Sequence, residues 1–293
     1  MDNLKLQGCG TALITPFKNE EVDYKAFENL VKFQVEAGIH FLVPLGTTGE
    51  TPCLMDNERI KILQIAKEHA QGRPVMVGVG TNSLVMTRGN IDTLAPYEPD
   101  AFLVVTPYYN KPSQDGLYSY FTAVADYAPK PVVLYNVPGR TGVNISADTT
   151  LRLAEHPNII AVKEASGNYD QISKIIAHAP KDFAVLCGND DETLSLMATG
   201  AAGVISVASN IVPRELVAMT EAMLRGDLAT ARPIHHRLFD LFKNCFVESN
   251  PIPAKAALSL MGMIRNELRL PLVPAQESTM ALMEKTLKDL NII

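Results

Sequence analysis

The chain has no tryptophan and only four cysteines among its 293 residues. The cysteines are Cys9, Cys53, Cys187 and Cys245, which lie 44, 134 and 58 residues apart. Such wide spacing excludes paired zinc ligands and a disulfide-dense scaffold, so we expect reduced thiols. The histidines form no HExxH pattern, and adjacent His235 and His236 would point about 100° apart on a helix. The sequence therefore predicts neither a metal centre nor a cofactor.

An excess of positive charge and a long apolar run are also missing. Lys and Arg number 26 against 32 Asp and Glu, and the resulting net charge of −6 disfavours binding to a phosphate backbone. No run of about 18 apolar residues is present to span a membrane. The start, from Met1 to Lys5, lacks the basic and apolar regions of a signal peptide. We expect a cytoplasmic protein that binds neither nucleic acid nor a membrane.

Short runs rich in Val, Ile and Leu recur along the chain. They begin at Thr11, His40, Pro74, Ala101, Pro131, Ile159, Phe183 and Gly203. Amphipathic stretches lie between them, for example at 23–37, 56–70, 114–127, 146–155 and 213–225. Apolar strands that alternate with helices are typical of a parallel sheet covered by helices. The segment "GVGTNS" does not match the dinucleotide fingerprint of an open sheet, so we predict an α/β fold, a (β/α)8 TIM barrel, over residues 1–225.

Residues 226–293 continue without strand-like runs. Helical patterns cover 229–245, 253–264 and 275–290, and prolines separate them. No low-complexity segment or flexible linker precedes this region. We therefore expect a C-terminal helical appendage on the barrel.

The run from Ile159 contains a lysine, Lys163, although a buried ammonium is costly unless it is paired or neutralised. Strand side chains alternate, so Lys163 shares a face with Ile159 and Ala161 and is expected to point into the barrel. It would lie near the carboxyl ends of the strands, where active sites of this fold are found. Tyr135 ends the preceding strand and places a phenol beside the amine. For Lys163 alone, a lysine that snorkels from a strand end is the alternative.

Polar residues follow other strands of the predicted barrel. Thr47 and Thr48 stand between glycines in "PLGTTGE", a pattern that fits a small-anion site or, alternatively, a tight turn. Tyr109 follows the fourth strand, where packing is the simpler reading, and Arg140 follows the fifth. The acidic "CGNDDE" segment is better explained as a helix cap than as a metal site. Together, an amine, a phenol, hydroxyls and a guanidinium favour imine formation between Lys163 and a carbonyl substrate.

Several long motifs resemble the dihydrodipicolinate synthase family of the pyruvate-dependent Schiff-base lyase superfamily, over nearly the whole chain. They are "GTTGE" (46–50), "VTPYYNKPSQDGL" (105–117), "YNVPGRTG" (135–142), "VKEASGN" (162–168), "GVISV" (203–207) and "ESNPIPAK" (248–255). The resemblance implies that Lys163 forms an imine with pyruvate, which becomes an enamine and attacks L-aspartate 4-semialdehyde, a step of lysine and diaminopimelate biosynthesis. It assigns proton transfer to Tyr135, with Thr47 and a Tyr109 from a neighbouring subunit in a hydroxyl relay. Because Tyr109 would come from a neighbouring subunit, the resemblance also implies a homo-oligomer, either a dimer or a tetramer.

The resemblance also implies binding residues. Thr48 would hold the pyruvate carboxylate with the backbone of Ile205, and Arg140 would receive the carboxylate of the semialdehyde. Two alternatives remain: a pyruvate-dependent aldolase that cleaves a sialic acid or a ketodeoxy sugar acid, and a catalytically silent binding protein. Met86 stands where lysine-inhibited family members have a glutamate, and Asp56 and Arg59 stand where they have histidines. Asp56 partly compensates as an anion, but the resemblance still implies weak feedback inhibition by lysine.

Overall fold

The structure, a computed structural model, describes residues 4–293. Met1, Asp2 and Asn3, on which the expected absence of a signal peptide partly rests, lie outside the described residues. Eight parallel strands are hydrogen-bonded in the order β4-β1-β10-β9-β8-β7-β6-β5. A parallel bridge between Leu42 and Val75 joins the two outermost strands, β4 and β5, and closes the barrel. The strands are β1 Gly8–Ala12, β4 Phe41–Val43, β5 Met76–Gly78, β6 Ala101–Val105, β7 Val132–Asn136, β8 Ile159–Glu164, β9 Ala184–Cys187 and β10 Gly203–Ser206.

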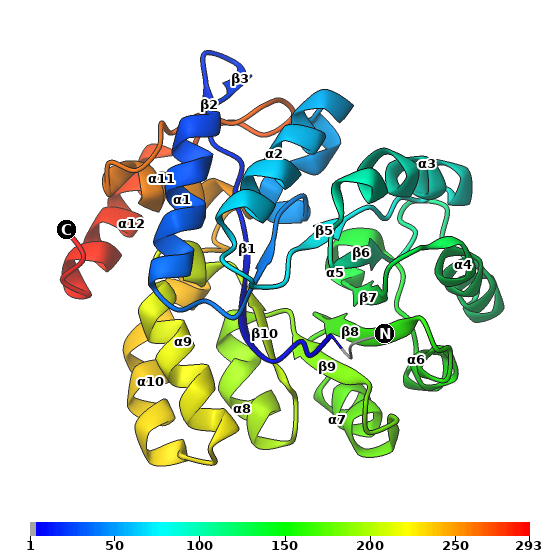
Figure 1. The fold of residues 1–293 in the computed structure, drawn as a ribbon. Coiled ribbons are helices and arrows are strands. Elements are labelled where there is room, and N and C mark those ends of the chain that lie inside the picture. Colours follow the sequence, from blue (N-terminus) through cyan, green and yellow to red (C-terminus); the bar gives the residue numbers. More distant parts are fainter. Residues whose placement is uncertain (1–3) are drawn as a thin grey trace.

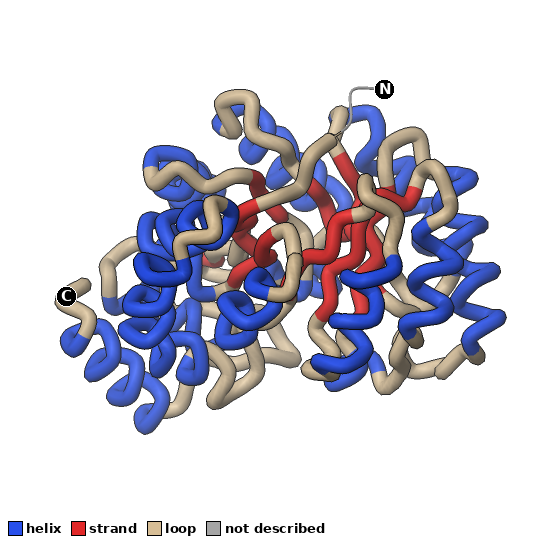
Figure 2. The backbone as a smooth tube through the Cα atoms, turned by 90° about the horizontal axis from the view of Figure 1, so that it is seen from below, coloured by secondary structure: helices blue, strands red, loops and turns tan. Residues whose placement is uncertain are grey.

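Helices surround these strands, so the predicted barrel is confirmed (Figure 1). In Figure 2 the strands lie in the interior and the helices form an outer layer. The barrel helices are α1 Tyr24–Glu36, α2 Asp56–His69, α3 Leu84–Leu94, α4 Gln114–Tyr127, α6 Ala147–Ala154, α7 Tyr169–His178, α8 Thr193–Ala198 and α9 Pro213–Leu224. A short helix, α5 (Pro138–Thr141), follows β7, and a small hairpin pairs β2 (Phe17–Lys18) with β3 (Glu21–Val22).

The first strand begins earlier than its apolar run predicts. The run begins at Thr11, whereas β1 begins at Gly8. The glycines of β1 allow close packing with its neighbours. A Cβ on Gly10 would lie 2.0 Å from the Phe41 ring. Gly8 is the register partner of Gly203 in β10, and a Cβ on Gly203 would lie 1.9 Å from the Gly8 carbonyl oxygen. Glycine predicts a loop when the sequence is read alone, but here it lets two strands and an aromatic ring pack closely.

Three helices follow the barrel, as predicted. They are α10 (Leu228–Asn244), α11 (Ile252–Leu260) and α12 (Glu277–Asp289). In Figure 1, α10 lies beside α9, with which it is in contact, and α11 packs against α12. The change from alternating strands and helices to helices alone falls between α9 and α10.

The buried side chains form an inner and an outer core. The inner core fills the barrel and contains Val133, Tyr135, Ala161 and Ile205, whereas the outer core lies between the strands and the helices. Within residues 4–293, no helix is both long and apolar enough to cross a bilayer. In the same part of the chain, no group of three His, Cys, Asp or Glu side chains is arranged to hold a metal ion.

Candidate active site

Lys163 and Tyr135 lie side by side on adjacent strands. They are register partners in β8 and β7, and the Lys163 Nζ lies 4.2 Å from the centre of the Tyr135 ring. Both side chains are buried, with 6% and 7% of their surface exposed. The alternation of side chains along each strand turns both into the barrel, as Tyr135 and Ala161 of the inner core show. The structure therefore brings the amine and the phenol together at the carboxyl ends of the strands.

Gly188, which follows β9, borders the Lys163 side chain. A Cβ at this position would lie 3.2 Å from the Lys163 Cε and 2.6 Å from the Ala165 Cβ. Glycine at this position avoids these close contacts with Lys163 and Ala165. Sequence reasoning missed this residue, because the glycine of "CGNDDE" gives no signal of the contact.

The Thr47–Thr48 turn lies at the same end of the barrel, after β4. It forms a short 3-10 helix, Thr47–Gly49, and ends at Glu50, which has a left-handed backbone with φ +52°. Thr48 is buried, and its Oγ1 accepts a hydrogen bond of 2.9 Å from the Asn250 side chain. The backbone of this segment therefore forms a tight turn, which was one of the two interpretations of its sequence. The turn also holds the Thr48 hydroxyl at a fixed position.

Arg140 lies in α5, close to the same asparagine. Its guanidinium donates to the Asn250 carbonyl oxygen at 3.2 Å and to the Ser249 Oγ at 3.5 Å. Asn250 therefore contacts both Thr48 and Arg140, while its own Oδ1 is buried without a hydrogen-bond partner. This residue comes from the "ESNPIPAK" motif, which sequence reasoning used only to support the family resemblance.

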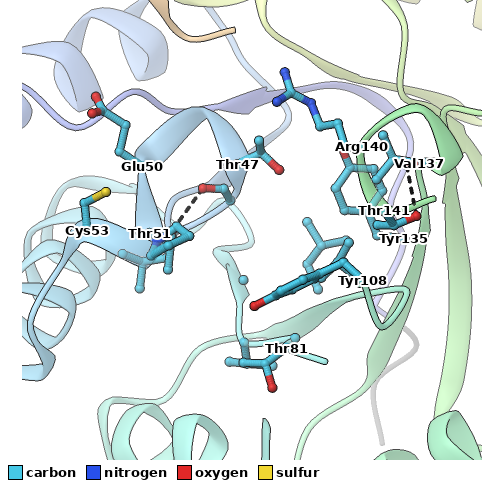
Figure 3. Close-up of a pocket in the computed structure, with 18 of the residues that line it drawn as sticks. Thr47, Glu50, Thr51, Cys53, Thr81, Tyr108, Tyr135, Val137, Arg140 and Thr141 are labelled. Atoms are coloured by element: carbon cyan, nitrogen blue, oxygen red, sulfur yellow. Dashed lines mark hydrogen bonds between the residues drawn. The ribbon is translucent and has the colours of Figure 1, made fainter. Parts of the chain in front are cut away.

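A cavity of about 580 Å³ lies among several of these groups. Thr47, Tyr135 and Arg140 line it, together with Tyr108 and Asn250 (Figure 3). Figure 3 shows the side chains of Thr47, Tyr108, Tyr135 and Arg140 around one open space. Such a concave space with several convergent polar groups is typical of a small-molecule site.

Four of the predicted residues, Lys163, Thr48, Tyr109 and Ile205, do not line the cavity. Tyr109 is 88% exposed, has a left-handed backbone with φ +73° and does not line the cavity within a single chain. Ile205 is fully buried in β10 and belongs to the inner core that also contains Tyr135. The single chain therefore brings Lys163, Tyr135, Thr47 and Arg140 together but leaves Tyr109 outside.

A buried ion pair holds the Thr47–Thr48 turn from behind. Glu50 and Lys255 of α11 are both fully buried, and the Lys255 Nζ lies 2.6 Å from the Glu50 Oε1. The same ammonium donates to the Thr15 carbonyl oxygen at 2.9 Å, and the Thr15 Oγ1 donates to the Gly49 carbonyl oxygen at 2.8 Å. Burial lowers the pKa of Lys255 to about 8, and the charge of Glu50 opposes that shift.

Comparison with known proteins identifies the family. The model of the dihydrodipicolinate synthetase family matches residues 5–290. The chain belongs to this family. A dihydrodipicolinate synthetase family relative from Phocaeicola vulgatus, a 4-hydroxy-tetrahydrodipicolinate synthase, is 49% identical over 100% of this chain and 99% of its own.

Solved structures of the dihydrodipicolinate synthetase family have the same fold. The crystal structure of dihydrodipicolinate synthase from Thermotoga maritima has a TM-score of 0.96 and 45% identity, covering 98% of this chain and 99% of its own. The chloride-inhibited enzyme from Acinetobacter baumannii, solved in complex with pyruvate, has a TM-score of 0.96 and 38% identity, covering 99% and 100% of the two chains.

Proposed function

We propose that the chain is a 4-hydroxy-tetrahydrodipicolinate synthase, a Schiff-base lyase that condenses pyruvate with L-aspartate 4-semialdehyde in lysine and diaminopimelate biosynthesis. The observation that supports it most directly is the position of Lys163 beside Tyr135, next to a cavity lined by Thr47 and Arg140. Family membership and the relatives named above support the same reaction.

The proposed chemistry begins at the Lys163 amine. Its nitrogen attacks the ketone carbon of pyruvate, and loss of water gives an imine. Thr48 and the backbone of Ile205 bind the pyruvate carboxylate. Removal of a methyl proton then gives an enamine, whose carbon attacks the aldehyde of the second substrate. The amino group of that substrate then attacks the imine carbon, which closes the ring and releases the Lys163 amine. Tyr135 gives and takes the protons of these steps, and the position of its ring, with its centre 4.2 Å from the Lys163 Nζ, supports this role.

A coupled assay separates this reaction from its alternatives. Pyruvate with L-aspartate 4-semialdehyde is expected to give turnover, whereas a sialic acid and a ketodeoxy sugar acid are expected to remain uncleaved. Cleavage of either sugar acid with no condensation would favour the aldolase. A protein that binds pyruvate without turnover of any substrate would favour a silent binding protein.

Arg140→Ala is expected to lower condensation by about tenfold to one hundredfold and to leave formation of the pyruvate adduct unchanged. The reason is that its guanidinium lines the cavity and is proposed to receive only the carboxylate of the second substrate. Trapping of the adduct and the coupled assay measure the two steps separately. The matched variant Arg140→Lys retains the charge but not the planar fork, so it is expected to recover part of the activity. Equal loss of both steps would contradict this role.

We also propose a homo-oligomer, a dimer or a tetramer, in which Tyr109 completes the hydroxyl relay of a neighbouring subunit. Its high exposure supports this, because the ring lies outside its own cavity. Tyr109→Phe and Lys163→Ala are each expected to be weakly active, and mixing them is expected to restore activity. Hybrid sites then contain both intact residues. Subunit exchange that is demonstrated by mass but brings no recovery would refute the shared relay.

Inhibition by L-lysine is expected to be weak, with half-inhibition above about 1 mM. Arg59 and Tyr108 both line the cavity, and the Arg59 guanidinium would repel the ligand's ammonium. Met86, where a glutamate would attract that ammonium, is 60% exposed and has no charge to offer. Titration of lysine into the coupled assay measures the effect, and Met86→Glu combined with Arg59→His is expected to increase it. Strong inhibition of the unmodified protein at micromolar lysine would contradict this reading.

We propose residues 1–225 as the barrel domain and 226–293 as a helical region that completes the site rather than a separate unit. Asn250 and Lys255, which contact Thr48 and Glu50 of the barrel, support this view.

We also propose the cytoplasm as the location of the protein, since four free cysteines fit a reducing compartment.

A further inference from the structure

Arg269 lies in the segment that joins α11 to α12 and connects this segment to three parts of the barrel region. Its guanidinium donates to both carboxylate oxygens of Glu58 in α2, each at 2.7 Å. It also donates to the Cys53 carbonyl oxygen at 2.8 Å and to the Glu20 carbonyl oxygen, in the β2–β3 hairpin, at 2.7 and 3.0 Å. In Figure 1 the segment between α11 and α12 passes beside this hairpin and α2. All three guanidinium nitrogens therefore have acceptors from the barrel region.

The contacts of Arg269 form a rigid junction. The side chains of Arg269 and Glu58 are 21% and 13% exposed, and their two parallel hydrogen bonds fix the orientation of both groups. The hydrogen bonds from Arg269 lower the pKa of Glu58, so the pair is charged at neutral pH. The guanidinium also lies over the Phe17 ring, 4.6 Å from its centre. A planar fork held in this way fixes the relative positions of the segments that it contacts.

The backbone of Arg269 extends this junction to the Thr47–Thr48 turn. Its N–H donates to the Glu50 Oε2 at 3.1 Å, while the Lys255 Nζ occupies the Glu50 Oε1 at 2.6 Å. Glu50 ends the turn, and its own N–H donates to the Thr47 carbonyl oxygen at 3.1 Å. The stretch that leads from the turn into α2 is thus tied to Arg269 at three points.

Two further hydrogen bonds hold other atoms of the turn. Thr15 donates to the Gly49 carbonyl oxygen, and Asn250 donates to the Thr48 hydroxyl. Both remain when the Arg269 side chain is removed. Loss of Arg269 is therefore expected to weaken the restraint on the turn rather than to unfold it.

We propose that Arg269 is a positioning residue that holds the Thr47–Thr48 turn in the geometry that binds the pyruvate carboxylate. This inference rests on the proposed function. Within residues 4–293, the hydrogen bonds of Arg269 involve neither Lys163 nor Tyr135. Its loss therefore weakens the binding of pyruvate and leaves the chemical steps at saturating pyruvate nearly unchanged.

The size of the effect follows from the fraction of molecules in which the turn has the binding geometry. If this fraction falls to between about one fifth and one tenth, the apparent dissociation constant of pyruvate rises by about fivefold to tenfold. A change of this order corresponds to the net loss of about one hydrogen bond.

The test measures the pyruvate concentration for half-trapping by borohydride, together with kcat and both KM values in the coupled assay. Arg269→Met removes the fork and keeps an apolar side chain. It is expected to raise the half-trapping concentration and the KM for pyruvate by about fivefold to tenfold, with kcat and the KM for the second substrate within about twofold. Arg269→Lys keeps the charge without the fork, and it is expected to raise the same two quantities by about twofold to fivefold.

Arg73 provides a matched control at the opposite end of the barrel. It donates to the carbonyl oxygens of Ile39 at 2.7 Å, Val35 at 3.0 Å and Ala70 at 3.4 Å, so its guanidinium also joins separate segments. Ile39 precedes β4 and Arg73 precedes β5, which places this junction at the amino ends of the strands. Arg73→Met is expected to lower the thermal midpoint, as Arg269→Met does, but to leave the KM for pyruvate within about twofold.

Three outcomes would overturn the inference. They are an unchanged half-trapping concentration in folded Arg269→Met, an equal rise in Arg73→Met, and a loss that falls on kcat while the KM for pyruvate stays unchanged. If Arg269→Met does not fold, Arg269→Lys is compared with Arg73→Lys, and an equal half-trapping concentration in the two would overturn the inference. Failure of the unmodified protein to trap pyruvate would instead refute the proposed function, so the two failures are distinguishable.

Discussion

Lys163→Met is expected to lower kcat/KM for the condensation by on the order of 10⁴-fold or more, with the fold intact. Methionine fills much of the lysine's volume inside the barrel but provides no nucleophile, and removal of an essential nucleophile has effects of this size. The other buried lysine, Lys255, is held in an ion pair with Glu50 and also donates to the Thr15 carbonyl oxygen. The coupled assay measures the loss, and the thermal midpoint checks the fold.

Lys243→Met is a suitable control for this variant. Lys243 is a surface lysine whose Nζ lies 2.9 Å from the Asp191 Oδ2, and exposed pairs of this kind contribute little to stability. We expect its activity to match that of the unmodified protein. Substantial residual activity in Lys163→Met, above about 1%, would show that the reaction does not require an imine at this position.

Lys255→Met is expected to lower the free energy of unfolding by about 3–5 kcal/mol. The substitution leaves the fully buried Glu50 carboxylate without its counter-ion, and this uncompensated charge is the main cost. It also removes the hydrogen bond to the Thr15 carbonyl oxygen. Denaturant unfolding measures the change.

The double variant Lys255→Met with Glu50→Gln tests whether the unpaired charge causes the loss. Neutral glutamine is expected to recover more than half of the free energy of unfolding that Lys255→Met loses, because no charge remains buried at this position. Its binding of pyruvate is expected to remain weaker than in the unmodified protein, since the Thr47–Thr48 turn has lost one of its restraints. A double variant as unstable as the sum of two single variants would contradict the proposed coupling between Glu50 and Lys255.

The barrel was predictable because its strands are buried on both faces. Runs such as "AFLVVTP" and "PVVLYNV" have no polar alternation, and amphipathic helices separate them. The neighbouring positions of Lys163 and Tyr135 also follow from the sequence, because sequential strands of such a barrel are adjacent and their side chains alternate. Periodicity alone therefore gives both the fold and the central pair of the candidate site.

The contacts that support the site were not predictable in this way. Lys255 approaches Glu50 across 205 positions of sequence, and no local pattern indicates that pairing. Gly188 borders Lys163 only because β8 and β9 are neighbours with a particular register. Glu164 lies in a family motif, but its hydrogen bonds to Asn136 and Gln171 depend on the packing of β7 and α7 against β8. These features depend on distances between elements, which composition and periodicity do not contain.

The most direct test of the central claim is borohydride reduction in the presence of pyruvate, followed by mass spectrometry of the digested protein. We predict a single pyruvate-derived mass increment on the peptide that contains Lys163, at close to one adduct per chain. Reduction without pyruvate is expected to leave that peptide unmodified. No increment, or an increment on a different lysine such as Lys255, would contradict the assignment of Lys163 as the imine-forming residue.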